Sequence, residues 1–305
     1  MTPDAVRAAL QQRLLAAGFY RLALGARRLP GIAVLGYHGL RPDDLPDEAL
    51  AFPNWHLAAS RFDAHCRVLA SHCDLLSLDD WRAIRAGRVP RPRRPVLVTF
   101  DDAYRSVWTI GAPILRRHGV PAAVFACSEP SYGRTRLWFD EAARTLGAAG
   151  VETSKHDSYA ALVARVAACG PIPDDDPEAV MAPSELRAFA AQAGIEIGSH
   201  TRRHAILARA TPDEQRMELA ESQRTLSEWT GRPVRALAYP NGRPGVDYTG
   251  DTVAAAHACG FDVAFSTRPA FALQTDPDLE QPRFLLTAAV SPAILLHRLA
   301  FSWAR

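Results

Sequence analysis

The chain lacks most of the features that crosslink or anchor a protein. Its five cysteines include no C-x-x-C pair and leave one thiol over, which argues against a disulfide framework or a structural zinc site. No run of about 18 apolar residues occurs, so no segment is predicted to cross a membrane. The first 30 residues have a helical apolar stripe, but Arg7, Arg13 and Arg21 interrupt it before a signal-type apolar region forms. These absences favour a reducing compartment, and we expect a cytoplasmic protein.

Lysine is almost absent, since Lys155 is the only one, and arginine supplies nearly all of the positive charge. The formal net charge is only +2, so we attribute the arginines to codon bias and expect no nucleic-acid partner. With 305 residues, 48% hydrophobic and 22% charged, the chain can form one large α/β domain or two smaller ones.

Short apolar runs alternate with helix-like stretches along most of the chain. Such alternation predicts parallel strands with helices outside, and the nearly continuous apolar runs suit strands buried on both faces. Gly119, Gly194 and Gly260 each follow a helical run and are expected to end it. The predicted strands are residues 31–38, 95–102, 122–127, 195–200, 236–240, 262–266 and 282–286, and the predicted helices between them are residues 104–118, 184–193, 212–230 and 250–259.

We expect a single barrel-like domain over residues 31–290. Residues 128–182 break the rhythm with two predicted helices and a polar, Pro-containing link, and we interpret them as an insertion on the barrel. Residues 1–30 are predicted to form an amphipathic helix that packs on its own domain or lies on a membrane surface or a partner. Residues 291–305 are predicted to form a terminal helix.

Two adjacent carboxylates, Asp101 and Asp102, end the predicted strand at residues 95–102. Neighbouring carboxylates repel one another, and each is costly to bury without a cation or a hydrogen-bond donor. Helix capping would explain one of them but does not require two.

Other strand ends carry a similar excess of polar groups. His38 and His200 each follow a predicted strand, and His204 comes four residues after His200. The carboxyl ends of parallel barrel strands share one face, where two imidazoles and one carboxylate form a metal site with open positions for water and substrate. Asp102 would then be the metal ligand, and Asp101 would remain free as a general base.

Taken in order, these motifs resemble the polysaccharide deacetylases of the NodB-homology type, carbohydrate esterase family 4. The family's T-F-D-D motif stands at residues 99–102, its H-[ST]-x-x-H motif at residues 200–204, and Ala238-Tyr239-Pro240-Asn241-Gly242 stands where many members have P-Y-G. The resemblance covers residues 32 to 285 approximately, and implies a distorted (β/α)7 barrel with a helical insertion.

The resemblance also assigns roles to individual residues. It implies that Asp101 is the catalytic base, that Asp102, His200 and His204 bind the metal, and that the backbone N–H of Asn241 helps to bind the oxyanion. Members with a Y-H motif on the first strand, the exopolysaccharide and poly-N-acetylglucosamine type, imply that His38 is the general acid. Tyr239, Asp140 and Arg283 resemble supporting positions, although a helix N-terminus would explain Asp140 and a surface arginine would explain Arg283. We interpret His297, on the terminal helix, as structural.

The predicted activity is metal-dependent removal of acetyl groups from N-acetylated sugars, by hydrolysis of a linear amide C–N bond. Zn²⁺ is the expected ion for two imidazoles and a carboxylate, and Co²⁺ or Ni²⁺ would fit the same ligands. Two alternatives remain open: hydrolysis of a small or cyclic amide on the same fold, and a non-catalytic carbohydrate-binding protein. The sequence identifies neither the sugar nor the oligomeric state.

Overall fold

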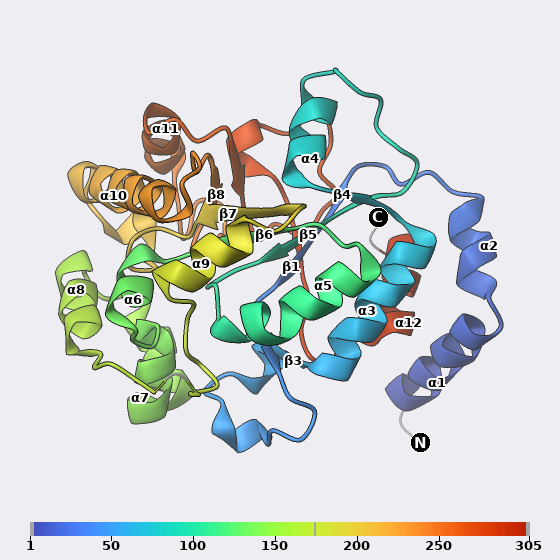
Figure 1. Cartoon of the computed structure of the whole chain (residues 1–305), viewed down its shortest axis with the longest axis horizontal. Coiled ribbons are helices and arrows are strands. Elements are labelled where there is room, and N and C mark those ends of the chain that lie inside the picture. Colours follow the sequence, from blue (N-terminus) through green and yellow to red (C-terminus); the bar gives the residue numbers. More distant parts are fainter. Residues whose placement is uncertain (1–2, 174, 303–305) are drawn as a thin grey trace.

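A parallel sheet of eight strands forms the centre of the computed structural model, which describes residues 3–173 and 175–302 (Figure 1). Seven strands follow the order β10-β1-β5-β6-β7-β8-β9, and β4 pairs with β5 beside this path. The sheet curls into a half-barrel, in agreement with the predicted distorted barrel, and an isolated bridge joins Phe265 of β9 to Gln281, which precedes β10. The strands are β1 (Ala33–Tyr37), β4 (Asp74–Leu76), β5 (Pro95–Phe100), β6 (Ala122–Ala126), β7 (Ile195–Ser199), β8 (Ala236–Ala238), β9 (Val263–Phe265) and β10 (Phe284–Leu285).

All seven predicted strands are present, and β4 is an addition. Strand β4 pairs with the first half of β5, from Pro95 to Leu97, whereas β6 pairs with the second half, from Val98 to Phe100. All six residues of β5 are buried, which agrees with the unbroken apolar run that predicted it.

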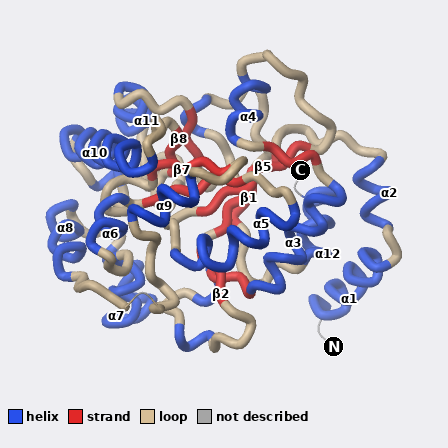
Figure 2. Tube along the Cα trace, in the orientation of Figure 1, coloured by secondary structure: helices blue, strands red, loops and turns tan. Residues whose placement is uncertain are grey.

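Helices cover the outside of the sheet (Figure 2). The predicted helix 104–118 starts at residue 105, because residues 101–104 form a tight turn after β5, and it contains a π-helical turn at Val107–Gly111. Helix α10 has the predicted bounds, since Thr211 and Glu214 form a capping box and Gly231 ends the helix with φ 68°. The outer helices are α3 (Ala59–His72), α4 (Leu78–Arg85), α5 (Ala112–His118), α9 (Pro183–Ala190), α10 (Pro212–Thr230) and α11 (Gly250–Ala258).

The N-terminal region forms two helices, α1 (Pro3–Ala16) and α2 (Phe19–Gly25), where one was predicted. Gly18 separates them, because its φ of 71° cannot continue a right-handed helix. Both pack against the C-terminal elements α12 (Pro292–His297) and a π-helical turn at Arg298–Ser302, so the two ends of the chain lie side by side (Figure 1). Residues 303–305 of the predicted terminal helix lie outside the described residues. In the described chain, no helix is long and apolar enough to cross a membrane.

Residues 128–182 contain three helices, one more than predicted, and Figure 1 shows them at the lower left of the molecule. They approach the loops that follow β1, where a short parallel pair of strands and two 3-10 turns lie. These elements are α6 (Ser128–Gly133), α7 (Trp138–Ser154), α8 (Tyr159–Ala168), β2 (Gly39–Arg41), β3 (His56–Ala58) and 3-10 turns at Asp47–Ala49 and Pro53–Trp55; further 3-10 turns are Leu207–Arg209 and Asp278–Glu280.

Candidate active site

Three side chains that could hold a metal ion converge at the carboxyl ends of the strands. Asp102 follows β5 and His200 follows β7, and His204 ends the turn after His200. The Nε2 atoms of His200 and His204 lie 3.6 and 3.5 Å from Asp102 Oδ1. One ligand atom from each residue lies within 4.8 Å of the other two, and all three residues are buried. The structure therefore brings together the three residues predicted to bind a metal.

The two imidazoles are oriented as ligands. The His200 ring donates from Nδ1 to the carbonyl oxygen of Ala238, 2.7 Å away, which leaves the Nε2 lone pair directed at the cluster. The indole of Trp138 donates to the carbonyl oxygen of His204, and the Phe139 ring packs on the His204 ring at 4.6 Å. Burial lowers the pKa of both histidines, which keeps them neutral and able to coordinate a cation.

Asp102 is the ligand candidate whose buried charge most requires a cation to balance it. Its Oδ1 atom is buried and has no hydrogen-bond partner among the described residues. Burial, together with the charge of Asp101, raises the pKa of Asp102 well above its usual value. A carboxylate without a counter-ion between two neutral imidazoles is a donor set that fits a divalent cation.

Asp101 has the opposite surroundings. Arg283, which is fully buried, donates from both terminal nitrogens to the two carboxylate oxygens of Asp101, at 2.7 and 2.9 Å. Burial alone would raise the pKa of Asp101, but the guanidinium and His200 hold it well below its usual value. The guanidinium also donates to the carbonyl oxygen of Ser266 and lies over the rings of Phe125 and Phe265. Arg283 is therefore a buried partner of Asp101, and the alternative of a surface arginine is wrong.

His38 follows β1 and lines the same cavity as the metal-ligand candidates. Its ring lies 4.6 Å from the ring of Trp55, and its Nδ1 has no partner among the described residues. Burial lowers the pKa of His38 to about 4, although the charge of Asp101 opposes part of this change. The imidazole is thus neutral near pH 7, and its pKa lies below the near-neutral value that suits an acid catalyst.

Asn241 and Tyr239 follow β8, on two sides of one turn. Asn241 lines the cavity, and its backbone N–H donates no hydrogen bond within the described chain. Its carbonyl oxygen accepts from the Thr267 hydroxyl, which fixes the turn. Tyr239 is buried behind the turn, where its hydroxyl donates to the carbonyl oxygen of Leu279 and its ring stacks on that of Tyr248.

Backbone strain is concentrated around these residues. Six described non-glycine residues have positive φ, and all except Arg134 lie in the loops of the candidate site. A positive φ is unfavourable for residues with a Cβ, and such strain often marks functional loops. The five residues are Asp102, Ala103, Thr201, His204 and Asn241.

A cavity of about 420 Å³ opens over the candidate metal ligands. Its floor carries Asp101, Asp102, His200, His204 and Asn241. Aromatic side chains from three separate segments form much of its wall, and Glu152, Lys155 and Arg243 are among the other residues that line it. The aromatic residues are Phe52, Trp55, Tyr104, Trp138 and Phe139.

A sequence profile of the family described as polysaccharide deacetylase matches residues 88–264, more than half of the chain. The chain belongs to the polysaccharide deacetylase family. The resemblance inferred from the motifs is therefore confirmed.

This member of the polysaccharide deacetylase family is similar to one curated relative and to several solved structures. YxkH of Bacillus subtilis (strain 168), whose name places it provisionally among the polysaccharide deacetylases, is 24% identical over 174 residues. The match covers 57% of this chain and 45% of YxkH, so the chain spans slightly under half of that relative.

The Streptococcus pyogenes deacetylase PplD, in complex with acetate, has a TM-score of 0.66 at 19% identity, with 89% of this chain and 99% of PplD covered. IcaB from Ammonifex degensii has a TM-score of 0.61 at 21% identity, with 91% and 98% covered. At these identities the likeness establishes the fold.

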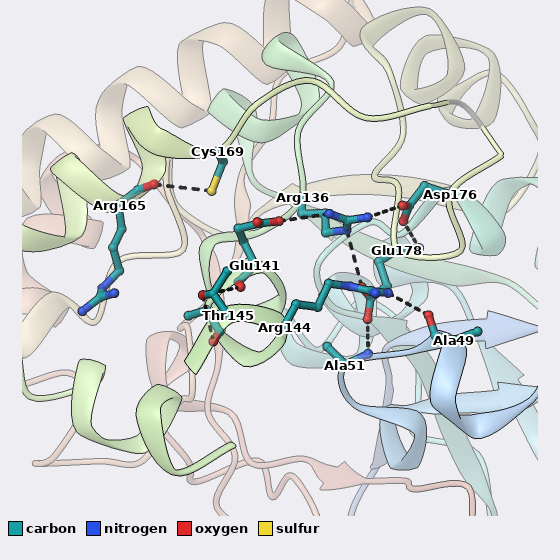
Figure 3. Close-up of polar contacts among 11 residues, drawn as sticks. Ala49, Ala51, Arg136, Glu141, Arg144, Thr145, Arg165, Cys169, Asp176 and Glu178 are labelled. Carbon is teal, nitrogen blue, oxygen red and sulfur yellow. Dashed lines mark hydrogen bonds and ion pairs between the residues drawn. The ribbon is translucent and has the colours of Figure 1, made fainter. Parts of the chain in front are cut away.

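An ion-pair network centred on the buried Glu178 connects two segments that carry the aromatic wall, and Figure 3 shows its polar contacts. Glu178, which is fully buried, accepts from the backbone N–H of Ala51 and from Arg144 Nε at 2.7 Å. Arg144 also donates to the carbonyl oxygen of Ala49, and Arg136 joins Glu178 to Asp176. We call Arg136, Arg144, Asp176 and Glu178 the insertion clamp. It ties the loop that carries Phe52 and Trp55 to the insertion that carries Trp138 and Phe139.

Asp140 and His297 lie outside the cavity lining. Asp140 is buried behind the wall, where its Oδ2 accepts from the Tyr104 hydroxyl at 2.7 Å, and burial and the charge of Glu178 raise its pKa well above the usual value. His297 lies 3.2 Å from the Tyr20 hydroxyl, beside the N-terminal helices. The aromatic wall and the insertion clamp were not predicted from the sequence. The run Phe52-Pro-Asn-Trp55-His56 was the available signal, since loops seldom concentrate aromatic rings without a surface to pack on.

Proposed function

We propose that the chain is a metal-dependent hydrolase that removes the acetyl group from N-acetylated sugars of a glycan or glycan intermediate. The convergence of Asp102, His200 and His204 beside an ionised Asp101 carries this proposal. Family membership and the aromatic wall also support it, because apolar faces of sugar rings pack well on aromatic side chains.

Asp102, His200 and His204 would hold the cation, and Zn²⁺ suits two imidazoles and a carboxylate. When bound, it would polarise the amide carbonyl and make a nearby water more acidic. Asp101 accepts the proton of the attacking water at a carboxylate oxygen, and Arg283 keeps that carboxylate ionised and fixed before the proton arrives. The backbone N–H of Asn241 donates to the carbonyl oxygen as negative charge develops on it.

The leaving amine needs a proton, and His38 is the residue that we assign to this step. Its pKa of about 4 means that it holds little positive charge before the reaction. Negative charge on the substrate oxygen would raise that pKa, as the charge of Asp101 already does. His38 would then take up a proton from solvent water and deliver it to the nitrogen of the leaving amine, while Asp101 returns the proton of the attacking water to solvent.

Acetate release from N-acetylated glucosamine oligomers by the zinc-loaded full chain tests the proposal, with a cyclic amide as the competing substrate. We expect acetate from the oligomers, and Asp101→Asn should lower the rate about 10²- to 10⁴-fold. Asp213→Asn, on an exposed helix end, is the matched control and should behave as the parent. Faster turnover of the cyclic amide, or zinc binding without hydrolysis of either substrate, would contradict the proposal.

A further inference from the structure

An unpaired basic and apolar surface lies on the flank opposite the insertion. We call it the basic flank, and it comprises α1, α2, residues 26–30 and the loop 86–94. Four of the large apolar side chains exposed in the described chain, Val6, Leu10, Phe19 and Leu22, belong to the two helices, and Leu22 is 77% exposed. Within α1, the spacing of Val6, Leu10 and Arg13 places all three on the outward face, whereas Gln11 is buried against the domain.

Apart from Asp4 in the first turn of α1, acidic residues are absent from the sequence segments that build this flank. Residues 5–42, 81–100 and 281–305 contain no Asp or Glu. The helices α1 and α2 pack on the last of these segments. Except for Arg7, which follows Asp4 by three residues, the arginines of the flank therefore have no acidic residue nearby in the sequence to neutralise them.

Hydrogen bonds to backbone carbonyl groups bring the arginines of two segments together. Arg28 donates to the carbonyl oxygen of Arg91 at 2.7 Å, and the N–H of Leu29 donates to that of Arg93 at 2.8 Å. Burial and the positive charge of Arg28 lower the pKa of Arg91, as expected where like charges gather. Within the described residues, no carboxylate forms an ion pair with a basic-flank arginine of known side-chain placement, namely Arg7, Arg13, Arg27, Arg28, Arg88, Arg91, Arg93 or Arg94. The Asp74 carboxylate accepts from the backbone N–H of Arg94, not from its guanidinium.

We propose that the basic flank docks the protein onto an anionic lipid membrane. Apolar side chains exposed beside arginines are the pattern of a helix that lies in a membrane interface, with the apolar groups inserted and the guanidinium groups among the lipid phosphates. A soluble polyanion would use the arginines but leave Leu10 and Leu22 in water. A second copy of the chain would bring two positive surfaces together, so charge complementarity selects the anionic membrane.

The docked orientation leaves the candidate active site accessible. The loop 86–94 leads into the amino end of β5, whereas the cavity lies at the carboxyl ends of the strands. In Figure 1, α1 and α2 lie on the right and α7 of the insertion lies at the lower left. A membrane-docked protein would therefore keep its cavity clear of the bilayer, where the cavity could reach glycan near the membrane surface.

Co-sedimentation of the full chain with phosphatidylcholine vesicles, with and without phosphatidylglycerol, tests the docking. We expect binding only to the anionic vesicles, and weaker binding as salt increases. Arg13→Glu/Arg88→Glu/Arg93→Glu should lower the partition coefficient about a hundredfold or more, because each arginine near an anionic surface contributes about fivefold. These three side chains are exposed and form no hydrogen bond within the described chain, so the fold should be unaffected.

Leu10→Gln/Leu22→Gln tests the apolar part and should also weaken binding to anionic vesicles, at unchanged net charge. The charge control is Arg116→Glu/Arg232→Glu/Arg235→Glu, which makes the same change at exposed arginines outside the flank and should retain binding. Equal loss in this control, equal binding to neutral vesicles, or no sedimentation with either vesicle would overturn the proposal. Full binding by the leucine variant would do so too, because a purely electrostatic surface would then suffice.

Discussion

Asp101 and Asp102 are consecutive residues whose pKa values are shifted in opposite directions. The fully buried guanidinium of Arg283 stabilises the charged form of Asp101, whereas burial beside Asp101 destabilises the charged form of Asp102. The positive φ of 69° at Asp102 turns the chain so that the two side chains face different partners. This geometry separates a carboxylate that is ionised before the reaction from a carboxylate that needs a cation.

Asp102→Asn should therefore have opposite effects on the metal-free and the metal-loaded protein. Without metal, the variant should unfold at the same temperature as the parent or higher, because it removes a buried carboxylate that is costly to ionise. With Zn²⁺, its affinity should fall at least about tenfold, since a ligand is lost. Thermal unfolding with and without Zn²⁺ measures both effects through ligand-linked stability.

Asp101→Asn is the comparison, because Arg283 loses its ionic partner while the three metal-ligand candidates remain. It should keep most of the zinc-dependent rise in unfolding temperature. If both variants lost that rise equally, the separation of roles between the two carboxylates would be wrong.

His38→Ala should separate substrates by their leaving groups. Amide hydrolysis needs a proton on the departing amine, whereas an activated phenyl ester has a leaving group that needs little protonation. We expect hydrolysis of N-acetyl sugars to fall about 10²-fold or more, and hydrolysis of the activated ester to change little. Steady-state rates on the two substrates measure this, and His297→Ala, in the contact with Tyr20, is the matched histidine control. Parallel losses on both substrates would remove the acid role from His38.

Sequence motifs located the residues of the cavity floor. Each of them lies at the end of a strand, and the local pattern together with the parallel topology is enough to predict that such residues share one face. The partner of Asp101 was harder to predict. Arg283 lies 182 positions away and its burial depends on the rings of Phe125 and Phe265, so a surface arginine remained an alternative. The pKa of His38 depends likewise on side chains from several segments.

At the scale of elements, the insertion clamp connects two segments that have no sequence signal in common. The loop 47–55 has little regular structure beyond its two 3-10 turns. Hydrogen bonds between its backbone and the side chains of Glu178 and Arg144 hold it against the insertion. Phe52 and Phe139 meet across this junction, with ring centroids 6.1 Å apart. The clamp thus fixes the width of the cavity at its aromatic wall.

Glu178→Gln should loosen this wall and weaken substrate binding more than it slows the reaction. A glutamine keeps one acceptor but loses the charge that pairs with Arg144 and Arg136, and a broken buried pair costs about 1–3 kcal/mol when one partner is partly exposed. We expect KM for a glycan oligomer to rise several-fold with a smaller change in kcat, and the loop 47–55 to become sensitive to proteolysis.

Glu228→Gln is the control for that change, because Glu228 pairs with Arg224 on an exposed helix surface where such pairs contribute little. It should alter neither KM nor proteolysis. A fall in kcat at constant KM for Glu178→Gln would instead place the clamp in the chemistry.

Elements with complete local signals were predicted well, and those without were missed. Helix α10 has a capping box and a terminal glycine, and both of its ends were predicted correctly. Strand β4 has three residues, too few for a periodic pattern, and depends on pairing with β5. The break between α1 and α2 did have a signal, Gly18, but the apolar stripe on both sides favoured one helix.

On the scale of the whole molecule, buried neutral histidines join separate layers of the fold. His65, on α3, bonds the hydroxyl of Tyr37 on β1 and the carbonyl oxygen of Val290, so one ring joins three segments. His56 is equally buried. Burial lowers the pKa of each from 6.5 to about 4.

These histidines should make the protein acid-sensitive. Between pH 6.5 and about 4 the unfolded chain binds a proton at each of them and the native chain does not, so each contribution to stability is present above pH 6.5 and is lost as the pH falls toward 4. The loss approaches roughly 3 kcal/mol for each group, at about 1.4 kcal/mol for each pKa unit. Asp102 and Asp140 act in the opposite direction, because burial raises their pKa values, so the total slope alone does not isolate a histidine.

His65→Gln isolates one of these contributions. Glutamine can bond both Tyr37 and the carbonyl oxygen of Val290 but cannot titrate, so the difference between parent and variant removes the shared effect of the carboxylates. Urea unfolding at several pH values should show the variant losing less stability than the parent between pH 6.5 and about 4. The slope of the unfolding free energy against pH should be smaller in the variant by up to the contribution of one bound proton. Equal slopes for parent and His65→Gln would mean that His65 titrates alike in the folded and unfolded chain, and the acid sensitivity would then belong to other groups.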